Sequence, residues 1–254
     1  MVWLAQDQPL HRPVAIKQAL VGGGESQQER LAARRRLRHE ARLAALVDHP
    51  GTVRVFDLAE EAGDPWIVME ALAGQTLDAT LGDRGPLPLA QVTGIGLRLL
   101  ETLEAIHRAG IVHRDVKPSN VQLCGGRRVV LTDFGIAAPV GDASAHRGVI
   151  VGSPAYTAPE LVHGGKAEPA SDLFSLGATL YAAAEGRSPF GKRCPAATLT
   201  AVVTDPPAPS RRAGPLGPLI EGLLAKDPGR RLGYGQTRSA LRAVQHQHPE
   251  SNCL

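Results

Sequence analysis

The chain has 254 residues, of which 43% are hydrophobic, 21% are charged and only 4% are aromatic. This length and apolar content suffice for one large domain or two modest lobes with an aliphatic core, and they exclude a disordered chain. The net charge of +3 is too small to indicate a nucleic-acid partner. We expect no membrane span, because no apolar run approaches the ~20 residues needed and no signal-peptide pattern is found.

The cysteines, Cys124, Cys194 and Cys253, are odd in number and widely spaced. They form neither a CxxC pair nor a Cys/His spacing typical of a zinc site. This pattern is typical of a reduced protein and favours a cytoplasmic location.

Two short strands are predicted at the start of the chain, over residues 1–5 and 14–17, with Pro9 and Pro13 in the turn between them. The second strand reads Val-Ala-Ile and ends in Lys17. Taken alone, a lysine at a strand end is typical of a side chain that points to water.

A long helix is predicted over residues 25–47, because apolar side chains recur at helical spacing and alanine is frequent. The recurring apolar residues are Leu31, Leu37, Leu43 and Leu46. Residues 53–58 and 66–69 then read as antiparallel strands around a turn at residues 63–65.

Further along, residues 91–110 follow an apolar helical pattern that ends at Gly110, and residues 129–132 read as a short buried strand. A polar loop lies between these elements. Its sequence is His113-Arg114-Asp115-Val116-Lys117-Pro118-Ser119-Asn120. A carboxylate, an ammonium and a carboxamide thus occur within six residues, held between two apolar elements.

Asp133-Phe134-Gly135 begins thirteen residues past Asn120, and Ala158-Pro159-Glu160 follows later. In this order, HRDxxxxN, DFG and APE resemble the signature set of eukaryotic-type protein kinases, specifically the bacterial Ser/Thr branch. Each short motif is weak alone, but their order and spacing make the set specific. The resemblance covers the chain from Val2 to about Val244.

This resemblance implies an α+β fold with two lobes and a nucleotide in the cleft between them. Residues 1–70 are expected to form a small antiparallel β lobe with one helix, and residues 71–75 the hinge. Residues 76–243 are expected to form a larger helical lobe, and residues 244–254 a polar tail.

By the same resemblance, Lys17 is expected to reach the α- and β-phosphates of ATP. Glu40 on the long helix is expected to pair with this lysine, since an unpaired ammonium would swing away from the phosphates. The adenine is expected to hydrogen-bond to backbone groups near Glu70 and Leu72 in the hinge, with Met69 at the gatekeeper position.

The polar loop is expected to carry the chemistry. Asp115 would accept a hydrogen bond from the acceptor hydroxyl and take its proton late in the transfer, while Lys117 would steady the γ-phosphate. Asn120 and Asp133 would ligate Mg²⁺, a hard cation that prefers oxygen ligands. A lysine two residues past the aspartate is the pattern of Ser/Thr rather than Tyr kinases.

Residues 136–157 resemble the activation segment, in which a phosphorylated residue would pair with Arg114. Before Ser153, only Ser144 carries a hydroxyl in this segment. We therefore expect activation-loop phosphorylation to be weak or absent, or to use Ser144. Ser153 is expected to hydrogen-bond near the catalytic aspartate and lysine.

Three further residues are expected to hold the large lobe together. Asp172, at the start of the central helix of the family, would bind backbone N–H groups of the polar loop. Glu160 would form a buried ion pair with Arg231, and removing one member of such a pair costs ~3–5 kcal/mol.

The sequence departs from the family at its beginning. The family places a GxGxxGxV loop before the lysine strand, where backbone N–H groups cover the phosphates. Val2 occupies the position of the last valine of that motif, so the first strand and the glycines are missing. Gly22-Gly23-Gly24 lies after the lysine strand and cannot replace them. Either the start codon is assigned too late, or the protein lacks this lid.

The leading hypothesis is a Ser/Thr protein kinase that transfers the γ-phosphoryl group of ATP to hydroxyls of protein substrates. One alternative is a pseudokinase, a nucleotide-binding scaffold module without the lid. It is disfavoured because the polar catalytic groups are all present, at Lys17, Glu40, Asp115, Asn120 and Asp133. A second alternative is a small-molecule kinase of the same fold, which the position of Lys117 and the APE motif disfavour.

Overall fold

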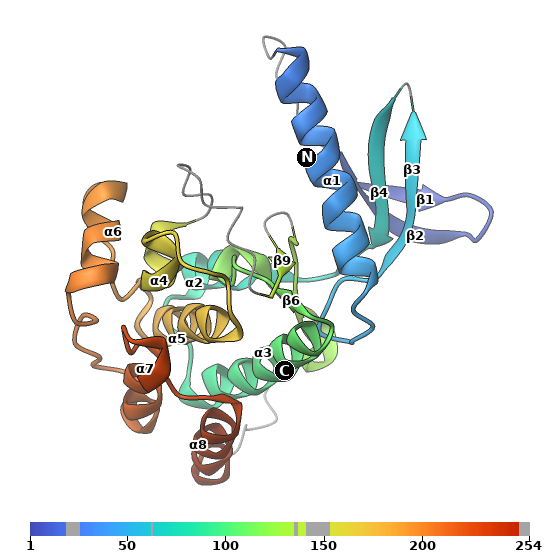
Figure 1. Cartoon of the computed structure of the whole chain (residues 1–254). Coiled ribbons are helices and arrows are strands. Elements are labelled where there is room, and N and C mark those ends of the chain that lie inside the picture. Colours follow the sequence, from blue (N-terminus) through green and yellow to red (C-terminus); the bar gives the residue numbers. More distant parts are fainter. Residues whose placement is uncertain (19–25, 62, 135–136, 141–152, 249–254) are drawn as a thin grey trace.

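The computed structural model describes residues 1–18, 26–61, 63–134, 137–140 and 153–248. Figure 1 shows a small lobe of strands with one long helix above a larger lobe built mainly of helices. This is the bilobal α+β architecture that the sequence predicts. No helix in these described ranges combines the length and apolarity needed to cross a membrane.

The small lobe contains a four-stranded antiparallel sheet in the order β1-β2-β4-β3. Its strands are β1 (Val2–Asp7), β2 (Arg12–Gln18), β3 (Val55–Glu61) and β4 (Asp64–Glu70). Side chains alternate along a strand, so Ala15 and Lys17 of β2 share one face of the sheet with their cross-strand partners Met69 and Ile67.

Helix α1 (Gln27–Ala45) confirms the helix predicted over residues 25–47 and packs on this face, with Leu37 against Ile67. It begins at a capping box. The Ser26 hydroxyl accepts a hydrogen bond from the Glu29 N–H, and the Glu29 carboxylate accepts one from the Ser26 N–H at 2.7 Å. These two bonds satisfy backbone donors that a helix start otherwise leaves without partners.

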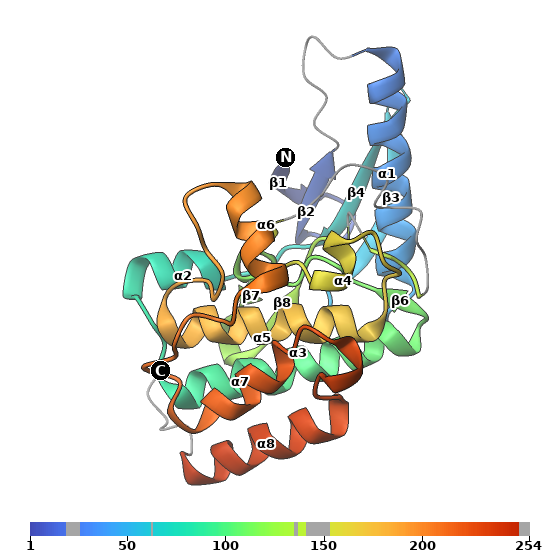
Figure 2. The same ribbon diagram turned by 60° about the vertical axis from the view of Figure 1, so that its left-hand side comes forward.

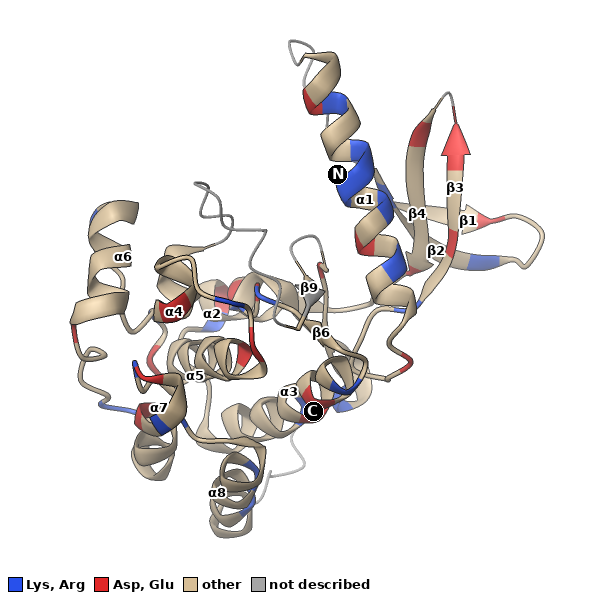
Figure 3. Ribbon diagram, in the orientation of Figure 1, with Lys and Arg blue, Asp and Glu red and all other residues tan. Residues whose placement is uncertain are grey.

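Basic side chains gather along α1 (Figure 3). Arg34 Nε donates to Asp64 Oδ1 at 2.6 Å, and Arg38 Nη2 donates to Glu60 Oε2 at 2.9 Å. Both acceptors lie near the β3–β4 turn, so these partly exposed ion pairs connect the helix to the far end of the sheet.

The chain crosses to the large lobe through residues 71–74, which adopt no regular structure. The next elements are β5 (Gln75–Thr76), α2 (Leu77–Arg84) and α3 (Leu89–Arg108). Helix α3 confirms the helix predicted over residues 91–110. The sequence did not predict α2, because this helix has eight residues and buries only two of them.

Short strands hold both ends of the polar loop. β6 (Ile111–Val112) precedes it and pairs with β9 (Ala138–Pro139), while β7 (Val121–Leu123) follows it and lies between β5 and β8 (Val129–Leu131). Strand β8 confirms the strand predicted near residue 130. The loop is therefore fixed on either side by backbone pairing.

Helix α5 (Pro169–Glu185) forms the centre of the large lobe, where every residue from Ser171 to Ala184 is buried. Helices α3 and α7 (Gly217–Leu223) pack beside it (Figure 2). Gly177 permits this close approach, because a Cβ at that position would lie 2.7 Å from the Cβ of Leu223.

The remaining helices are α4 (Pro159–Val162), α6 (Pro195–Thr204) and α8 (Tyr234–Gln247), with 3₁₀ turns at residues 118–120, 125–127, 154–156, 214–216 and 228–230. Helix α8 packs against α3. The boundary predicted for the polar tail, residue 244, is too early. The reason is that α8 continues to Gln247 and buries Val244 in the main core.

A buried ion pair joins α4 to the segment before α8, as predicted. The Arg231 guanidinium donates to both Glu160 carboxylate oxygens, at 2.8 and 2.9 Å, and to the Ala170 carbonyl at 2.6 Å. The Arg231 side chain is 1% exposed and that of Glu160 is 17% exposed. Burial alone would raise the pKa of Glu160, but the hydrogen bonds and charge of Arg231 outweigh it, and the pKa is lowered.

We expect Arg231→Ala to lower the free energy of unfolding by ~3–5 kcal/mol, because it leaves the Glu160 carboxylate largely buried without its cation. Urea unfolding at neutral pH measures this loss. The control is Arg230→Ala, which removes an exposed guanidinium with no ion pair in the described part of the chain. It should change stability by less than about 0.5 kcal/mol. Similar losses in both variants would contradict a special role for the pair.

The same pair predicts acid sensitivity. The pKa of Glu160 is lower in the folded chain than its ordinary value of 4.5. The carboxylate therefore contributes stability above pH 4.5, and this contribution is lost as the pH falls through the folded pKa. The stability difference between the unchanged chain and Arg231→Ala should shrink over that fall. Urea midpoints measured across acidic pH check this, and a difference that stays constant would argue against it.

Candidate active site

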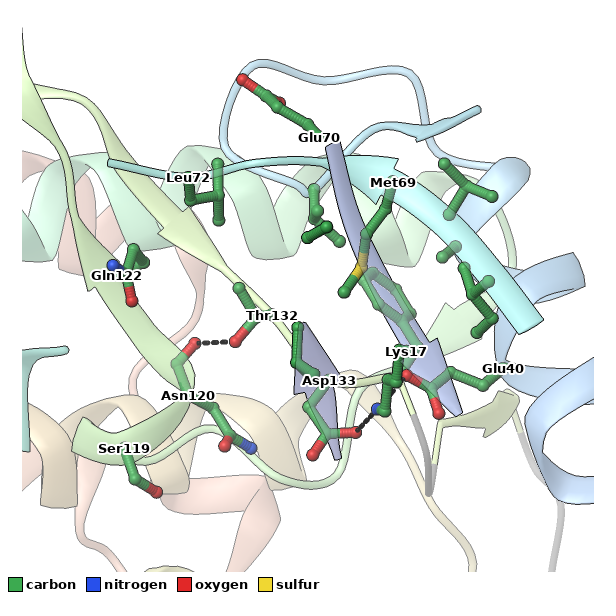
Figure 4. A pocket seen from close by; sticks show the side chains of 17 residues that line it. Lys17, Glu40, Met69, Glu70, Leu72, Ser119, Asn120, Gln122, Thr132 and Asp133 are labelled. Carbon is green, nitrogen blue, oxygen red and sulfur yellow. Dashed lines mark hydrogen bonds and ion pairs between the residues drawn. The ribbon is translucent and has the colours of Figure 1, made fainter. Parts of the chain in front are cut away.

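A cavity of about 370 Å³ lies between the two lobes. Figure 4 shows that it brings together side chains from β2, α1 and β4 of the small lobe with others from the polar loop and the residues after β8. Apolar groups, including Ala15, Met69 and Leu72, line one part of it, while Lys17 and Asp133 meet at another part. The volume lies within the range typical of small-ligand sites.

Lys17 joins the two lobes at this cavity. Its Nζ donates to Glu40 Oε1 of α1 at 2.5 Å and to Asp133 Oδ1 at 3.1 Å (Figure 4). Burial alone would lower the pKa of Lys17, but the two carboxylates outweigh it and the pKa is raised. The lysine therefore stays an ammonium at neutral pH, and the predicted partnership with Glu40 is formed.

The polar loop brings two of the predicted groups, Lys117 and Asn120, onto the carboxylate of a third, Asp115. Asp115 Oδ2 accepts hydrogen bonds from Lys117 Nζ at 2.7 Å and from Asn120 Nδ2 at 2.8 Å. The same Asn120 nitrogen also donates to the Asp115 backbone carbonyl at 2.9 Å. Because the nitrogen of the carboxamide faces Asp115, its oxygen faces away from that carboxylate.

Asp172 anchors the polar loop to helix α5, as predicted. Its carboxylate, which is fully buried in α5, accepts hydrogen bonds from the backbone N–H groups of His113 and Arg114, both at 2.7 Å. His107 Nε2 of α3 lies 2.7 Å from the same carboxylate. Burial alone would raise the pKa of Asp172, but its hydrogen bonds with His107 and the loop outweigh it and the pKa is lowered.

This anchor helps to hold an unusual backbone. Arg114 has a φ of 68°, in the left-handed region that non-glycine residues seldom adopt. Asp133 has a φ of 70°. Both residues belong to the predicted motifs, so the uncommon backbone lies where the chemistry is expected.

Oxygen ligands suited to a hard cation are available at the cavity. Asn120 and Asp133 both line it, and the Asp133 side chain is 45% exposed. The described residues contain no cluster of three or more His, Cys, Asp or Glu side chains that could hold a metal ion. A cation would therefore take few ligands from these residues and the rest from a bound phosphate or water, which is typical of Mg²⁺.

The hinge residues border the cavity with their backbone. Met69, Glu70 and Leu72 all line it. The Glu70 side chain points away from the cavity, and those of Met69 and Leu72 lie toward it (Figure 4). The adenine contact expected for the backbone near Glu70 and Leu72 stays a prediction.

The side chains of His113 and Phe134 pack against each other in the core next to the polar loop. Their rings meet edge to face, with centroids 5.0 Å apart, and both side chains are buried. Burial lowers the pKa of His113, so the ring stays neutral at pH 7. His113 is therefore a packed core imidazole.

Two regulatory predictions stay predictions. Ser144 and most of the segment expected to meet Arg114 lie outside the described residues. The Ser153 hydroxyl makes no hydrogen bond to Asp115 or Lys117 within the described chain, while the Ser153 carbonyl accepts one from the Tyr156 N–H at 3.0 Å.

Sequence reasoning missed several side chains of the site. His107 supports Asp172, and Thr132 donates from its hydroxyl to the Asn120 carbonyl at 3.1 Å. His107 is the next-to-last residue of α3. Nothing in the local sequence indicated that it would meet a residue 65 positions later.

The protein kinase domain model matches residues 1–248 of this chain. Serine/threonine-protein kinase PknK of Mycobacterium tuberculosis is 40% identical over 185 residues, which cover 72% of this chain and 16% of PknK. PknL of the same organism is 40% identical over 190 residues, which cover 74% of this chain and 47% of PknL. PknA of that organism is 36% identical over 242 residues, which cover 92% of this chain and 55% of PknA.

The chain thus spans about half or less of the length of these relatives. The family match covers nearly all of its residues, including both lobes and the cavity between them. On this match and this geometry, the chain belongs to the protein kinase domain family.

Proposed function

We propose that this chain is a Ser/Thr protein kinase that transfers the γ-phosphoryl group of ATP to protein hydroxyls. One observation carries the proposal. Lys17, Glu40, Asn120 and Asp133, from distant parts of the sequence, line one cavity between two lobes, and Asp115 is hydrogen-bonded to Asn120 beside it. They supply a cation for phosphates, oxygens for Mg²⁺ and a carboxylate for the acceptor, which are the parts that phosphoryl transfer needs.

The small lobe would hold the nucleotide. Lys17 is fixed by two carboxylates, so its ammonium is oriented before a triphosphate arrives and little ordering remains to be done on binding. The backbone of Glu70 and Leu72 would meet the adenine edge, between the apolar walls of the cavity.

The residues present fit Mg²⁺. The carboxamide oxygen of Asn120 and the half-exposed carboxylate of Asp133 would hold it, both being hard oxygen donors. When bound, the ion would neutralise negative charge between the β- and γ-phosphates. Asp133 already contacts Lys17, so the lysine and the metal ligand are held side by side.

The large lobe would handle the acceptor. Asp115 would accept the hydroxyl hydrogen bond and take the proton, while Lys117, 2.7 Å from it, would reach the transferred phosphoryl group. Asn120 and Lys117 fix the orientation of the Asp115 carboxylate. Arg114 would pair with a phosphorylated residue of the activation segment, and Ser153 would hydrogen-bond near Asp115 and Lys117.

Three lines support protein serine and threonine as acceptors. Lys117 follows Asp115 by two residues, an APE motif is present, and the relatives PknA, PknK and PknL are named as serine/threonine-protein kinases. The cysteines Cys124 and Cys194 are free thiols in the described chain, which suits a reducing cytoplasm where ATP is available.

We expect Asp115→Asn to lower phosphoryl transfer by roughly 10²–10⁴-fold, because the amide cannot take the proton. Lys17→Met should lower it by roughly 10²–10³-fold, because a charge aimed at the phosphates is lost. Incorporation of radiolabelled phosphate from ATP with Mg²⁺ into a general Ser/Thr protein substrate measures both effects.

Two matched controls accompany these variants. Asp48→Asn and Lys166→Met make the same chemical changes at exposed positions away from the cavity and should retain full activity. Equal incorporation by the unchanged chain, Asp115→Asn and Lys17→Met would remove the enzyme proposal. ATP binding without any transfer would instead favour a nucleotide-binding scaffold.

We further expect Asp172→Asn to lower the turnover number by roughly ten- to a hundredfold, since an amide offers one acceptor oxygen and turns its donor hydrogens toward the loop N–H groups. ATP affinity should change little, because the nucleotide is held mainly by the small lobe. Steady-state kinetics with varied ATP separates the two parameters. A change confined to the Michaelis constant for ATP would show that Asp172 does not act through the loop.

A further inference from the structure

Arg128, between the 3₁₀ turn at residues 125–127 and β8, binds two other parts of the chain. Its Nη1 and Nη2 donate to Glu70 Oε1 and Oε2, the second bond measuring 2.9 Å. Its Nε donates to the backbone carbonyl of Pro50 at 2.8 Å. One guanidinium therefore makes three hydrogen bonds, all to acceptors outside the β7–β8 hairpin. The two-pronged contact between Arg128 and the Glu70 carboxylate is called the fork below.

The two residues that accept these bonds, Glu70 and Pro50, lie next to the hinge and to helix α1. Glu70 is the last residue of β4, directly before the irregular residues 71–74 that connect the lobes. Its side chain is directed away from the cavity while its backbone borders it (Figure 4). Pro50 lies in the turn that follows α1, the helix that carries Glu40.

Arg128 also stands at the start of the strand that leads to Asp133. Strand β8 is only three residues long, and its last residue, Leu131, donates its N–H to the Gly51 carbonyl at 2.7 Å. The turn after α1 therefore contacts both ends of β8. Pro50 accepts a hydrogen bond from Arg128, the residue before β8, and Gly51 accepts one from Leu131, the last residue of β8. Movement of the hinge or of α1 against the large lobe would break these bonds.

The fork is polar and partly open to solvent rather than a stabilising core contact. The side chains of Arg128 and Glu70 are 33% and 28% exposed. The hydrogen bonds from Arg128 lower the pKa of Glu70, so the pair is ionised at neutral pH. Partly exposed pairs contribute little to global stability. A two-pronged contact does, however, fix orientation, because both prongs must be aligned at once.

We propose that Arg128 is a positioning residue for the nucleotide cleft: it ties the last residue of β4 and the turn after α1 to the β7–β8 hairpin, and so sets the angle between the lobes. The inference rests on the proposed function in that the cleft is taken to bind ATP. The productive contacts of Lys17 with Glu40 and Asp133 are present together with the fork. The fork therefore holds the lobes in the arrangement in which Lys17 contacts both carboxylates.

The first measurement is ATP binding. Arg128→Ala should weaken the affinity for ATP with Mg²⁺ by about three- to tenfold, the range of one lost coupling between neighbouring groups. The turnover number at saturating ATP should change by less than about twofold, since bound nucleotide restores the lobe angle. Arg128→Lys should fall between the two, because an ammonium keeps the charge and loses the fork.

Arg54→Ala is the matched control. Arg54 is exposed and close to Glu70, whose N–H donates to the Arg54 carbonyl at 2.9 Å, but the Arg54 side chain makes no hydrogen bond to the Glu70 carboxylate. This variant removes a nearby positive charge and keeps the fork. Its ATP affinity should match that of the unchanged chain, and an equal loss in Arg54→Ala and Arg128→Ala would overturn the positioning role.

The second measurement needs no nucleotide. Hydrogen–deuterium exchange of the backbone amides of residues 71–74 should be several-fold faster in Arg128→Ala and unchanged in Arg54→Ala. If the unchanged chain neither binds ATP nor transfers phosphate, the proposed function fails, and this exchange still decides whether the fork holds the hinge. If the unchanged chain is active but Arg128→Ala shows the same exchange or the same ATP affinity, the inference about Arg128 alone is overturned.

Discussion

The carboxylate of Asp172 is buried completely in the central helix, yet it remains ionised because three hydrogen-bonding groups surround it. Two of these groups are backbone N–H donors of the polar loop, which follows β6, and the third is His107 of α3. A buried charge needs all of its partners, since removing one leaves a large desolvation cost. The loop is thereby fixed to the deeply buried helix α5, and this attachment positions the side chains of Asp115 and Asn120.

The small lobe is built differently. Among the described residues, its separate core cluster consists of the buried Leu37, Ala41 and Ile67, whereas the large lobe contains an extensive apolar core. Helix α1 is therefore attached to the sheet partly by ion pairs, at Asp64, Glu60 and Lys17. Because the Lys17–Glu40 pair belongs both to this attachment and to the cleft, the position of α1 and the aim of the lysine are coupled.

The parts that sequence reasoning predicted correctly are those with local signals. The long helix, α3 and β8 follow from apolar periodicity, and the polar residues that meet at the cavity follow from ordered motifs. The parts it missed have weak local patterns: α2 buries only two of its residues, and α8 continues past residue 244 because Val244 meets a core contributed by other helices. Likewise, neither His107 nor Arg128 belongs to a motif, and their partners lie 65 and 58 residues away in the sequence.

By itself, the sequence determined which chemical groups the protein carries and in which order, since short motifs and periodicity are properties of neighbouring residues. It therefore indicated the cation and the carboxylates, and the resemblance that the motifs carry implied the two lobes and the Glu160–Arg231 pair. Only the tertiary structure decided how the lobes are held relative to each other and that His107 joins Asp172 in supporting the loop. Those answers depend on contacts between residues far apart in the chain, whose geometry is set by the packing of the whole molecule and leaves no local pattern in the sequence.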